Sequence, residues 1–158
     1  MAACSRSSAG FTMVELLAYI SIYLLLLTLV VPCAKSITAA GSRLELEGFC
    51  QRLAADISAL QQDSLWGNSL QNKFTLDLNG QSYNIYRGGQ LQKTVRLAEA
   101  GQGQLYFYSP NTWQLRFSDE GAPNGYFYVL IKNRQQPQLA KKFEVQPVTG
   151  RIVISDIK

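Results

Sequence analysis

The chain begins with one long apolar stretch. From Phe11 to Val31 nearly every side chain is apolar, and the one charged residue is Glu15. As a helix this stretch would cover about 31 Å, which is close to the thickness of a bilayer's hydrocarbon core. The pattern therefore predicts a transmembrane or filament-core helix over residues 11–32.

A second pattern follows, in which apolar residues recur at spacings of three and four. This spacing predicts an amphipathic helix over residues 33–66, ending near Leu65. Pro32, Gly41 and Gly48 are expected to bend it. The whole helix would be about 80 Å long, so its first half must be covered by lipid or by neighbouring subunits. The predicted apolar stripe consists of Leu46, Phe49, Cys50, Leu53, Ile57 and Leu60.

Residues 70–158 show the alternation that is typical of strands. Asn79-Gly80 is a strong hairpin signal, and it predicts that Leu76 lies opposite Tyr83 and Phe74 opposite Ile85. Short connections favour a mainly antiparallel sheet with the helical stripe on one face, which is an α+β fold. Further strands are expected near Leu91–Leu97, Leu105–Tyr108, Gln114–Ser118, Tyr126–Lys132, Lys142–Val148 and Arg151–Ile157.

The residue types that most enzymes need are scarce. The chain has no histidine, which removes the usual general base and the commonest zinc ligand. The adjacent carboxylates Asp119-Glu120 are expected in a solvated turn. Cys33 and Cys50 would lie about 25 Å apart on one helix, too far to form a disulfide within a subunit. They are either small apolar helix residues or partners in a bridge between subunits. We expect no catalysis, cofactor or metal.

Glu15 needs a physical explanation. A carboxylate near the centre of a bilayer costs about 2.5–3.5 kcal/mol on insertion scales, and less near the end of a span. Glu15 could remain at the headgroups, or it could pair with a cation. Cleavage of the chain after Gly10 would create such a cation, the amino group of Phe11.

These residues also carry a family resemblance. Gly10-Phe11-Thr12-x-x-Glu15, followed by Leu16-Leu17, resembles the cleavage and methylation signal of type IV prepilins and pseudopilins. The resemblance implies that a prepilin peptidase and methyltransferase removes the leader, residues 1–10, and methylates Phe11. It further implies that Glu15 then guides assembly by meeting the Phe11 amine of a neighbouring subunit. Pro32 matches a proline that kinks the long helix in this family.

The implied function is that of a structural subunit, a minor pilin or pseudopilin. It would belong to a type II secretion pseudopilus, a type IV pilus or a competence filament. Its precursor would span the bacterial cytoplasmic membrane once, with the C-terminal domain outside. Turn segments at 115–121 and 149–151 resemble those of H-type minor pseudopilins, and competence pseudopilins have a similar outline. Two alternatives stay open: a secretory signal peptide cut near Ala34–Ala40, and a single-span anchor whose outer domain binds a ligand.

Charge adds a second hypothesis, contact with DNA. Residues 11–86 carry four basic and six acidic side chains, whereas residues 87–158 carry ten basic and five acidic ones. Basic residues beside exposed aromatic rings can hold nucleic acid. Most of the aromatic residues in this half are expected in the sheet core, and the basic ones could equally solvate a loop. The candidate contact residues are Lys132, Arg134, Lys141 and Lys142.

Overall fold

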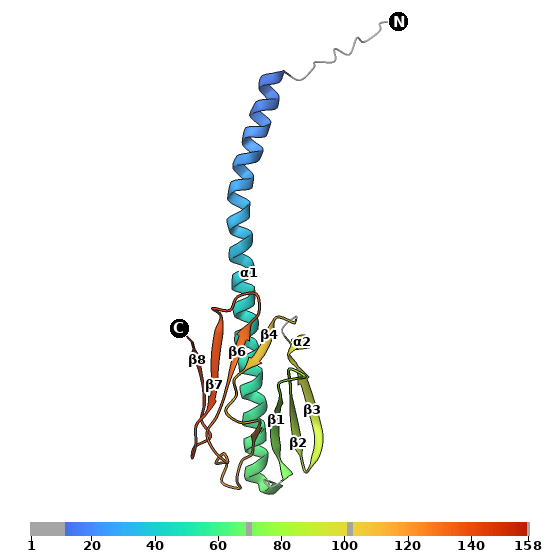
Figure 1. The fold of residues 1–158 in the computed structure, drawn as a ribbon, viewed down its shortest axis with the longest axis vertical. Helices are drawn as coiled ribbons and strands as arrows, with labels where there is room; N and C mark the ends of the chain where they lie inside the picture. The colour runs from blue at the N-terminus through green and yellow to red at the C-terminus, as the bar shows by residue number, and fades with distance from the viewer. Residues whose placement is uncertain (1–11, 69–70, 101–102, 158) are drawn as a thin grey trace, which may run out of the picture. The chain divides into compact units, whose positions relative to one another are not determined.

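The computed structural model describes the backbone of residues 12–68, 71–100 and 103–157, with side chains placed there except at 29–39, 68 and 100. It divides into two compact units, residues 1–39 and 40–158. Helix α1 (Met13–Asp63) contributes to both units (Figure 1). In the described part of the chain, no helix is both long enough and apolar enough to cross a membrane. Gly10, the predicted last residue of the leader, and Phe11, the predicted first residue of the helix, lie outside the described residues.

The second half of α1 confirms the predicted amphipathic stripe. All six residues of this stripe, which runs from Leu46 to Leu60, are at most 3% exposed. The helix ends at Asp63, close to the predicted end, because the next turn, η1 (Ser64–Asn68), is irregular. Gly67 has a φ of +104° there, a left-handed conformation that glycine adopts without a steric penalty. The helical assignment runs without a break through Pro32, Gly41 and Gly48, and the kink at Pro32 stays a prediction.

The strands form two four-stranded sheets, whereas the sequence pattern was interpreted as one. The described strand pairs are all antiparallel. The first sheet has the order β3-β2-β1-β5, and the second has the order β4-β6-β7-β8. A short helix, α2 (Leu97–Ala100), lies between them in sequence. The strands are β1 (Lys73–Asp77), β2 (Ser82–Arg87), β3 (Gln90–Arg96), β4 (Leu105–Tyr108), β5 (Gln114–Leu115), β6 (Phe127–Asn133), β7 (Ala140–Val145) and β8 (Ile152–Asp156).

The first hairpin has the predicted register but a different turn. Leu76 lies opposite Tyr83 and Phe74 opposite Ile85, as expected. The left-handed residue of the turn is Gln81, with a φ of +44°, and neither Asn79 nor Gly80 has a positive φ. The register holds because Phe74, Tyr83 and Ile85 must all face the core, whatever the geometry of the loop.

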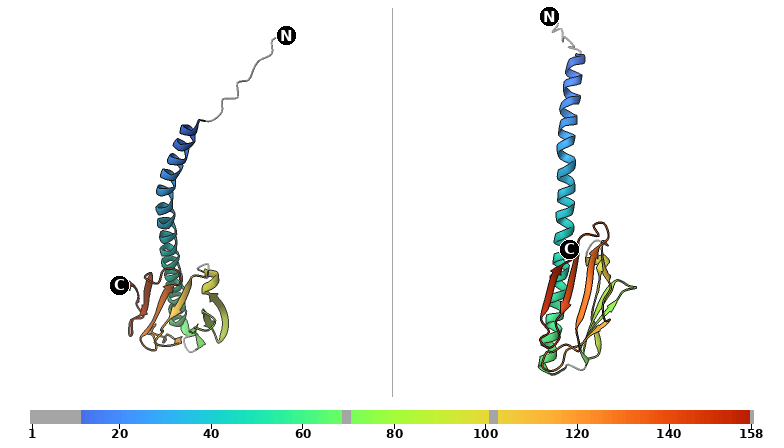
Figure 2. Two further views of the ribbon diagram at one scale, coloured as in Figure 1. Left: turned by 45° about the horizontal axis from the view of Figure 1, so that its top comes forward. Right: turned by 60° about the vertical axis from the view of Figure 1, so that its left-hand side comes forward.

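One core joins the helix to both sheets. Figures 1 and 2 show the second half of α1 running alongside the strands of both sheets. The ring of Phe49 on α1 lies 5.9 Å from Phe107 of β4 and 6.3 Å from Tyr83 of β2. Phe74 of β1 and Phe127 of β6 meet edge to face at 5.7 Å. These contacts bury one face of each sheet against the same helix and leave the opposite faces to solvent.

Candidate functional site

Glu15 lies in a capping box at the start of α1. Its Oε2 accepts hydrogen bonds from the backbone N–H and the hydroxyl of Thr12, at 2.9 and 3.0 Å. The Thr12 hydroxyl also lies 3.3 Å from the Glu15 backbone nitrogen, which donates to it. This reciprocal pattern satisfies donors that the first turn of a helix leaves without intrahelical partners. The Thr-x-x-Glu spacing is a known sequence signature of such a start, and the sequence interpretation overlooked it.

From Leu16 to Leu27 the surface of α1 is apolar on all sides. The consecutive residues Leu24, Leu25, Leu26 and Leu27 are 56%, 63%, 51% and 40% exposed in the single chain. Consecutive helical residues point about 100° apart, so these four together surround the axis. A helix that is hydrophobic all round is normally buried by other helices or by lipid. Among the described residues of the first unit, no side chain covers this surface.

The polar side chains in this segment are satisfied locally. The hydroxyl of Ser21 donates to the carbonyl of Leu17 at 2.8 Å, and that of Thr28 donates to the carbonyl of Leu25 at 2.7 Å. Such bonds remove the cost of placing a hydroxyl in apolar surroundings. The segment is therefore suited to being enclosed by apolar groups.

The basic candidates do not all share one surface. Lys132 on β6 and Lys142 on β7 face outward on the second sheet, and Arg134 follows β6. Lys141 instead lies at the inner side, 11% exposed, with its Nζ 3.1 Å from Asp156 Oδ1 and 3.7 Å from Glu47 Oε1. Lys141 therefore does not share the outward face of Lys132 and Lys142, and its contact with nucleic acid stays a prediction. Strand parity could have shown this, because Lys141 shares its face with the buried Phe143.

The aromatic residues of this half also differ from the expectation. Phe107, Phe117, Phe127 and Phe143 are in the core, but the five others are not buried, against the prediction that most would be. The tyrosines lie beside the outward cations: Lys142 Nζ is 5.2 Å from the ring centre of Tyr128. The residues left out of the core are Tyr106, Tyr108, Trp113, Tyr126 and Tyr128.

Lys142 is partly neutralised by a neighbour. Its ammonium and the hydroxyl of Tyr126 both contact Oε1 of Glu144. The hydrogen bond from Lys142, and then that from Tyr126, lowers the pKa of the Glu144 carboxyl, and the contact with Glu144 raises the pKa of Lys142. Both groups are therefore charged at neutral pH, and they offset each other.

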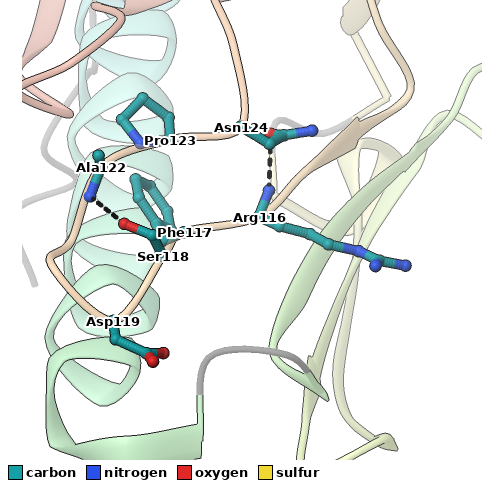
Figure 3. A pocket seen from close by; sticks show the side chains of 7 residues that line it. All are labelled: Arg116, Phe117, Ser118, Asp119, Ala122, Pro123 and Asn124. Carbon is teal, nitrogen blue, oxygen red and sulfur yellow. Dashed lines mark hydrogen bonds between the residues drawn. The ribbon is translucent and has the colours of Figure 1, made fainter.

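A shallow pocket of about 350 Å³ lies at the turn after β5 (Figure 3). Its wall is made mostly by the turn itself: Ser118 Oγ accepts from the backbone of Ala122 at 3.2 Å, and Asn124 Oδ1 accepts from the backbone of Arg116 at 3.0 Å. In Figure 3 the Arg116 side chain points away from Phe117. The Ser118 hydroxyl is engaged in holding the turn, and among the described residues that line the pocket the titratable ones are Arg116 and Asp119. Asp119 lies in a turn, as expected.

The expectations from the sequence also concerned the cysteines and the possible metal-binding side chains. Cys50 is buried as a free thiol, consistent with a small apolar helix residue, and the side chain of Cys33 lies outside the described ones. Within the described ranges, no group of three or more His, Cys, Asp or Glu side chains could hold a metal ion. No protein-family model, curated protein or solved structure matches this chain.

Proposed function

We propose that the chain is a structural subunit of a helical filament, a minor pilin or pseudopilin that is cut after Gly10 and N-methylated at Phe11. The filament would be a type II secretion pseudopilus, a type IV pilus or a competence filament. The precursor would wait in the bacterial cytoplasmic membrane with the C-terminal domain outside. The leader motif Gly10-Phe11-x-x-x-Glu15 carries the resemblance on which the processing steps rest.

The observation that carries the proposal is the uncovered apolar surface from Met13 to Leu27. Met13, Val14 and Tyr23 are 80%, 75% and 63% exposed, and the apolar side chains surround the helix. Burying this much apolar surface is favourable at about 25 cal/mol per Å². Several copies of the same helix packed together would bury all sides at once, as would lipid before assembly.

Glu15 would set the axial register of that packing. A carboxylate at the edge of an apolar helix bundle favours the one axial position of its helix, relative to the neighbouring helices, in which the carboxylate meets a cation. The methylated amine of Phe11 in a neighbouring subunit would be that cation. Glu15 already accepts two bonds from Thr12, so a capping role for the carboxylate is the competing explanation.

Two substitutions separate these roles. Glu15→Gln keeps an oxygen that can close the capping box but removes the charge, whereas Glu15→Ala removes both. If charge pairing guides assembly, both variants should enter filaments at least about tenfold less than the parent chain, which corresponds to ~1.4 kcal/mol. Glu45→Gln, a carboxylate change farther along the same helix, is the matched control and should assemble normally.

The readout is the amount of subunit in sheared or purified filaments relative to the amount in membranes. Assembly of Glu15→Gln at the parental level, with loss only in Glu15→Ala, would show that capping alone matters. Mass spectrometry of the mature amino terminus tests processing. An intact Met1, or a cut near Ala34–Ala40, would reject the pilin proposal and leave the single-span anchor or the secreted protein.

A further inference from the structure

Strands β4 and β6 place two tyrosines and two cations next to one another. Leu105 and Phe107 of β4 face the core, so the alternate residues Tyr106 and Tyr108 face outward. Lys132 Nζ lies 4.2 Å from the ring centre of Tyr108. Together with Arg134, these outward residues form what we call the tyrosine–cation strip: Tyr106, Tyr108, Lys132 and Arg134.

The same kind of contact, a cation beside a tyrosine ring, occurs twice in the strip. Arg134 Cζ lies 5.9 Å from the ring centre of Tyr106, and Lys132 contacts Tyr108. Both contacts are diagonal across the strand pair, because Tyr106 is the direct neighbour of Lys132. Residues two apart on a strand are separated by about 6.7 Å. An extended polymer with a ring and a charge in each repeat would match this spacing.

The charge of the strip is positive. In the described part of the chain, Lys132 and Arg134 contact tyrosine rings, whereas Lys142 on the neighbouring strand is offset by Glu144. Tyr108 is 49% exposed, so part of its ring is open to a ligand. Cation–tyrosine contacts at exposed sites are weak, and the two cations can therefore turn toward a phosphate without a large loss.

We propose that the tyrosine–cation strip binds single-stranded nucleic acid. Unpaired bases would stack on Tyr106 and Tyr108, and the phosphates between them would contact Lys132 and Arg134. Single strands fit because a base that is not paired can lie on a tyrosine ring, whereas the bases of a duplex present only their edges in the grooves. The proposal is independent of the filament function, since it uses none of the residues of α1.

The test uses the full chain in a neutral detergent and a short fluorescent oligothymidylate, with anisotropy as the readout. The parent chain should bind at low salt, and its affinity should fall steeply as salt rises. The double variant Lys132→Gln/Arg134→Gln should bind at least about tenfold more weakly. Its log–log salt slope should be shallower by about 1.4, because each phosphate contact on a single strand contributes about 0.7.

The chain provides a matched control on the other sheet. Lys73 Nζ lies 4.5 Å from the ring centre of Tyr86, which is the same kind of contact outside the strip. Lys73→Gln should change the affinity by less than about twofold, because removing a distant charge affects only long-range attraction. A second double variant, Tyr106→Leu/Tyr108→Leu, keeps the charges and should weaken oligothymidylate binding while leaving the salt slope unchanged.

Several outcomes would overturn the proposal. Absence of oligothymidylate binding at low salt would do so, as would an equal loss in Lys73→Gln. Duplex binding as tight as single-strand binding, with no effect of the tyrosine changes, would point to general attraction by charge. If the Lys132→Gln/Arg134→Gln variant lost binding to phosphatidylglycerol vesicles but kept the oligonucleotide, the strip would be a lipid-headgroup site. Unchanged melting temperatures of the variants are required, so that altered binding is not a folding defect.

Discussion

The phenol of Tyr83 donates a 2.6 Å hydrogen bond to Oδ2 of Asp56 and so ties strand β2 to helix α1. Both oxygens of the same carboxylate lie 2.7 Å from Lys93 Nζ on β3. Tyr83 is fully buried, and burial, followed by the bond to Asp56, raises the pKa of its hydroxyl. The first sheet is thus fastened to the helix by a polar contact at the edge of the apolar core.

This contact should contribute measurably to stability. We expect Tyr83→Phe to lower the free energy of unfolding by about 1–2 kcal/mol, because a hydrogen bond to a charged group is lost. Asp56→Ala should cost about 2–3 kcal/mol, since it leaves a buried hydroxyl unpaired. A double-mutant cycle in urea should give a coupling of about 1 kcal/mol or more. The control cycle on Arg96 and Glu99, whose side chains are 67% and 72% exposed, should give close to zero. Equal couplings in the two cycles would contradict this role for Tyr83.

Gly150 should tolerate no side chain. Its φ is +65°, and a Cβ built there would collide with Nε2 of Gln61 and lie 3.0 Å from the carbonyl oxygen of Gly121. That amide matters because Gln61 Nε2 donates to the same Gly121 carbonyl at 2.7 Å and holds the turn against the end of α1. We expect Gly150→Ala to lower the free energy of unfolding by about 3 kcal/mol or more, from backbone strain and the collision together.

Gly103 separates these two causes. It has a φ of +77° but nothing within 4 Å of its built Cβ. Gly103→Ala should therefore cost only the strain of the left-handed conformation, about 1–2 kcal/mol. In a Gln61→Ala background, the cost of Gly150→Ala should fall toward that value. If it does not fall, the collision with Gln61 is not the cause. Urea denaturation of the four variants measures each cost.

Cys50 should be unreactive in the folded chain. Burial raises the pKa of its thiol from 9.0 to about 12, although the charge of Lys141 opposes the shift. Near pH 8 the thiolate fraction should thus be lower by roughly a thousandfold than in an unfolded chain. With Cys4 and Cys33 replaced by alanine, a thiol reagent should label the protein slowly until guanidinium is added. Rapid labelling of the folded chain would contradict the burial of Cys50.

The same shift gives a sign for the pH dependence of stability. Between about pH 9 and 12 the unfolded thiol loses its proton while the folded one keeps it, so the unfolded state binds fewer protons. The free energy of unfolding should therefore fall as pH rises through this window, by at most about 1.4 kcal/mol per pH unit. Cys50→Ala should flatten the fall without removing it, because the raised pKa of Tyr83 acts in the same direction. An unchanged slope in Cys50→Ala would show that the folded thiol ionises normally.

Much of the fold was predictable because it follows local periodicity. The stripe from Leu46 to Leu60 has the spacing of one helix face, and every member is buried. The pairing of Leu76 with Tyr83 follows from a two-residue period and a short loop. What the periodicity could not give was the division into two sheets. That division depends on which strands separated in sequence pair with each other, such as β1 with β5 and β4 with β6.

The candidate sites divide in the same way. Glu15 is recognisable from local sequence alone, since the motif that resembles a prepilin leader and the capping box both lie within six residues. The tyrosine–cation strip could not be recognised from the sequence, because Tyr106 and Phe107 are both aromatic and their pattern does not say which one faces the core. Packing of Phe107 against Phe49 of α1 decided it, and so turned Tyr106 outward.

The sequence by itself determined the apolar helix, the amphipathic stripe, the first hairpin and the position of Glu15, because each depends on neighbours a few residues away. Only the tertiary structure decided that Lys141 is tied to Glu47 and Asp156 while Lys132 faces outward beside Tyr108. The physical reason is that one side of β6 and of β7 must be buried in the core beside the helix. Neighbouring cations on one strand can therefore end up on opposite faces, as Lys141 and Lys142 do.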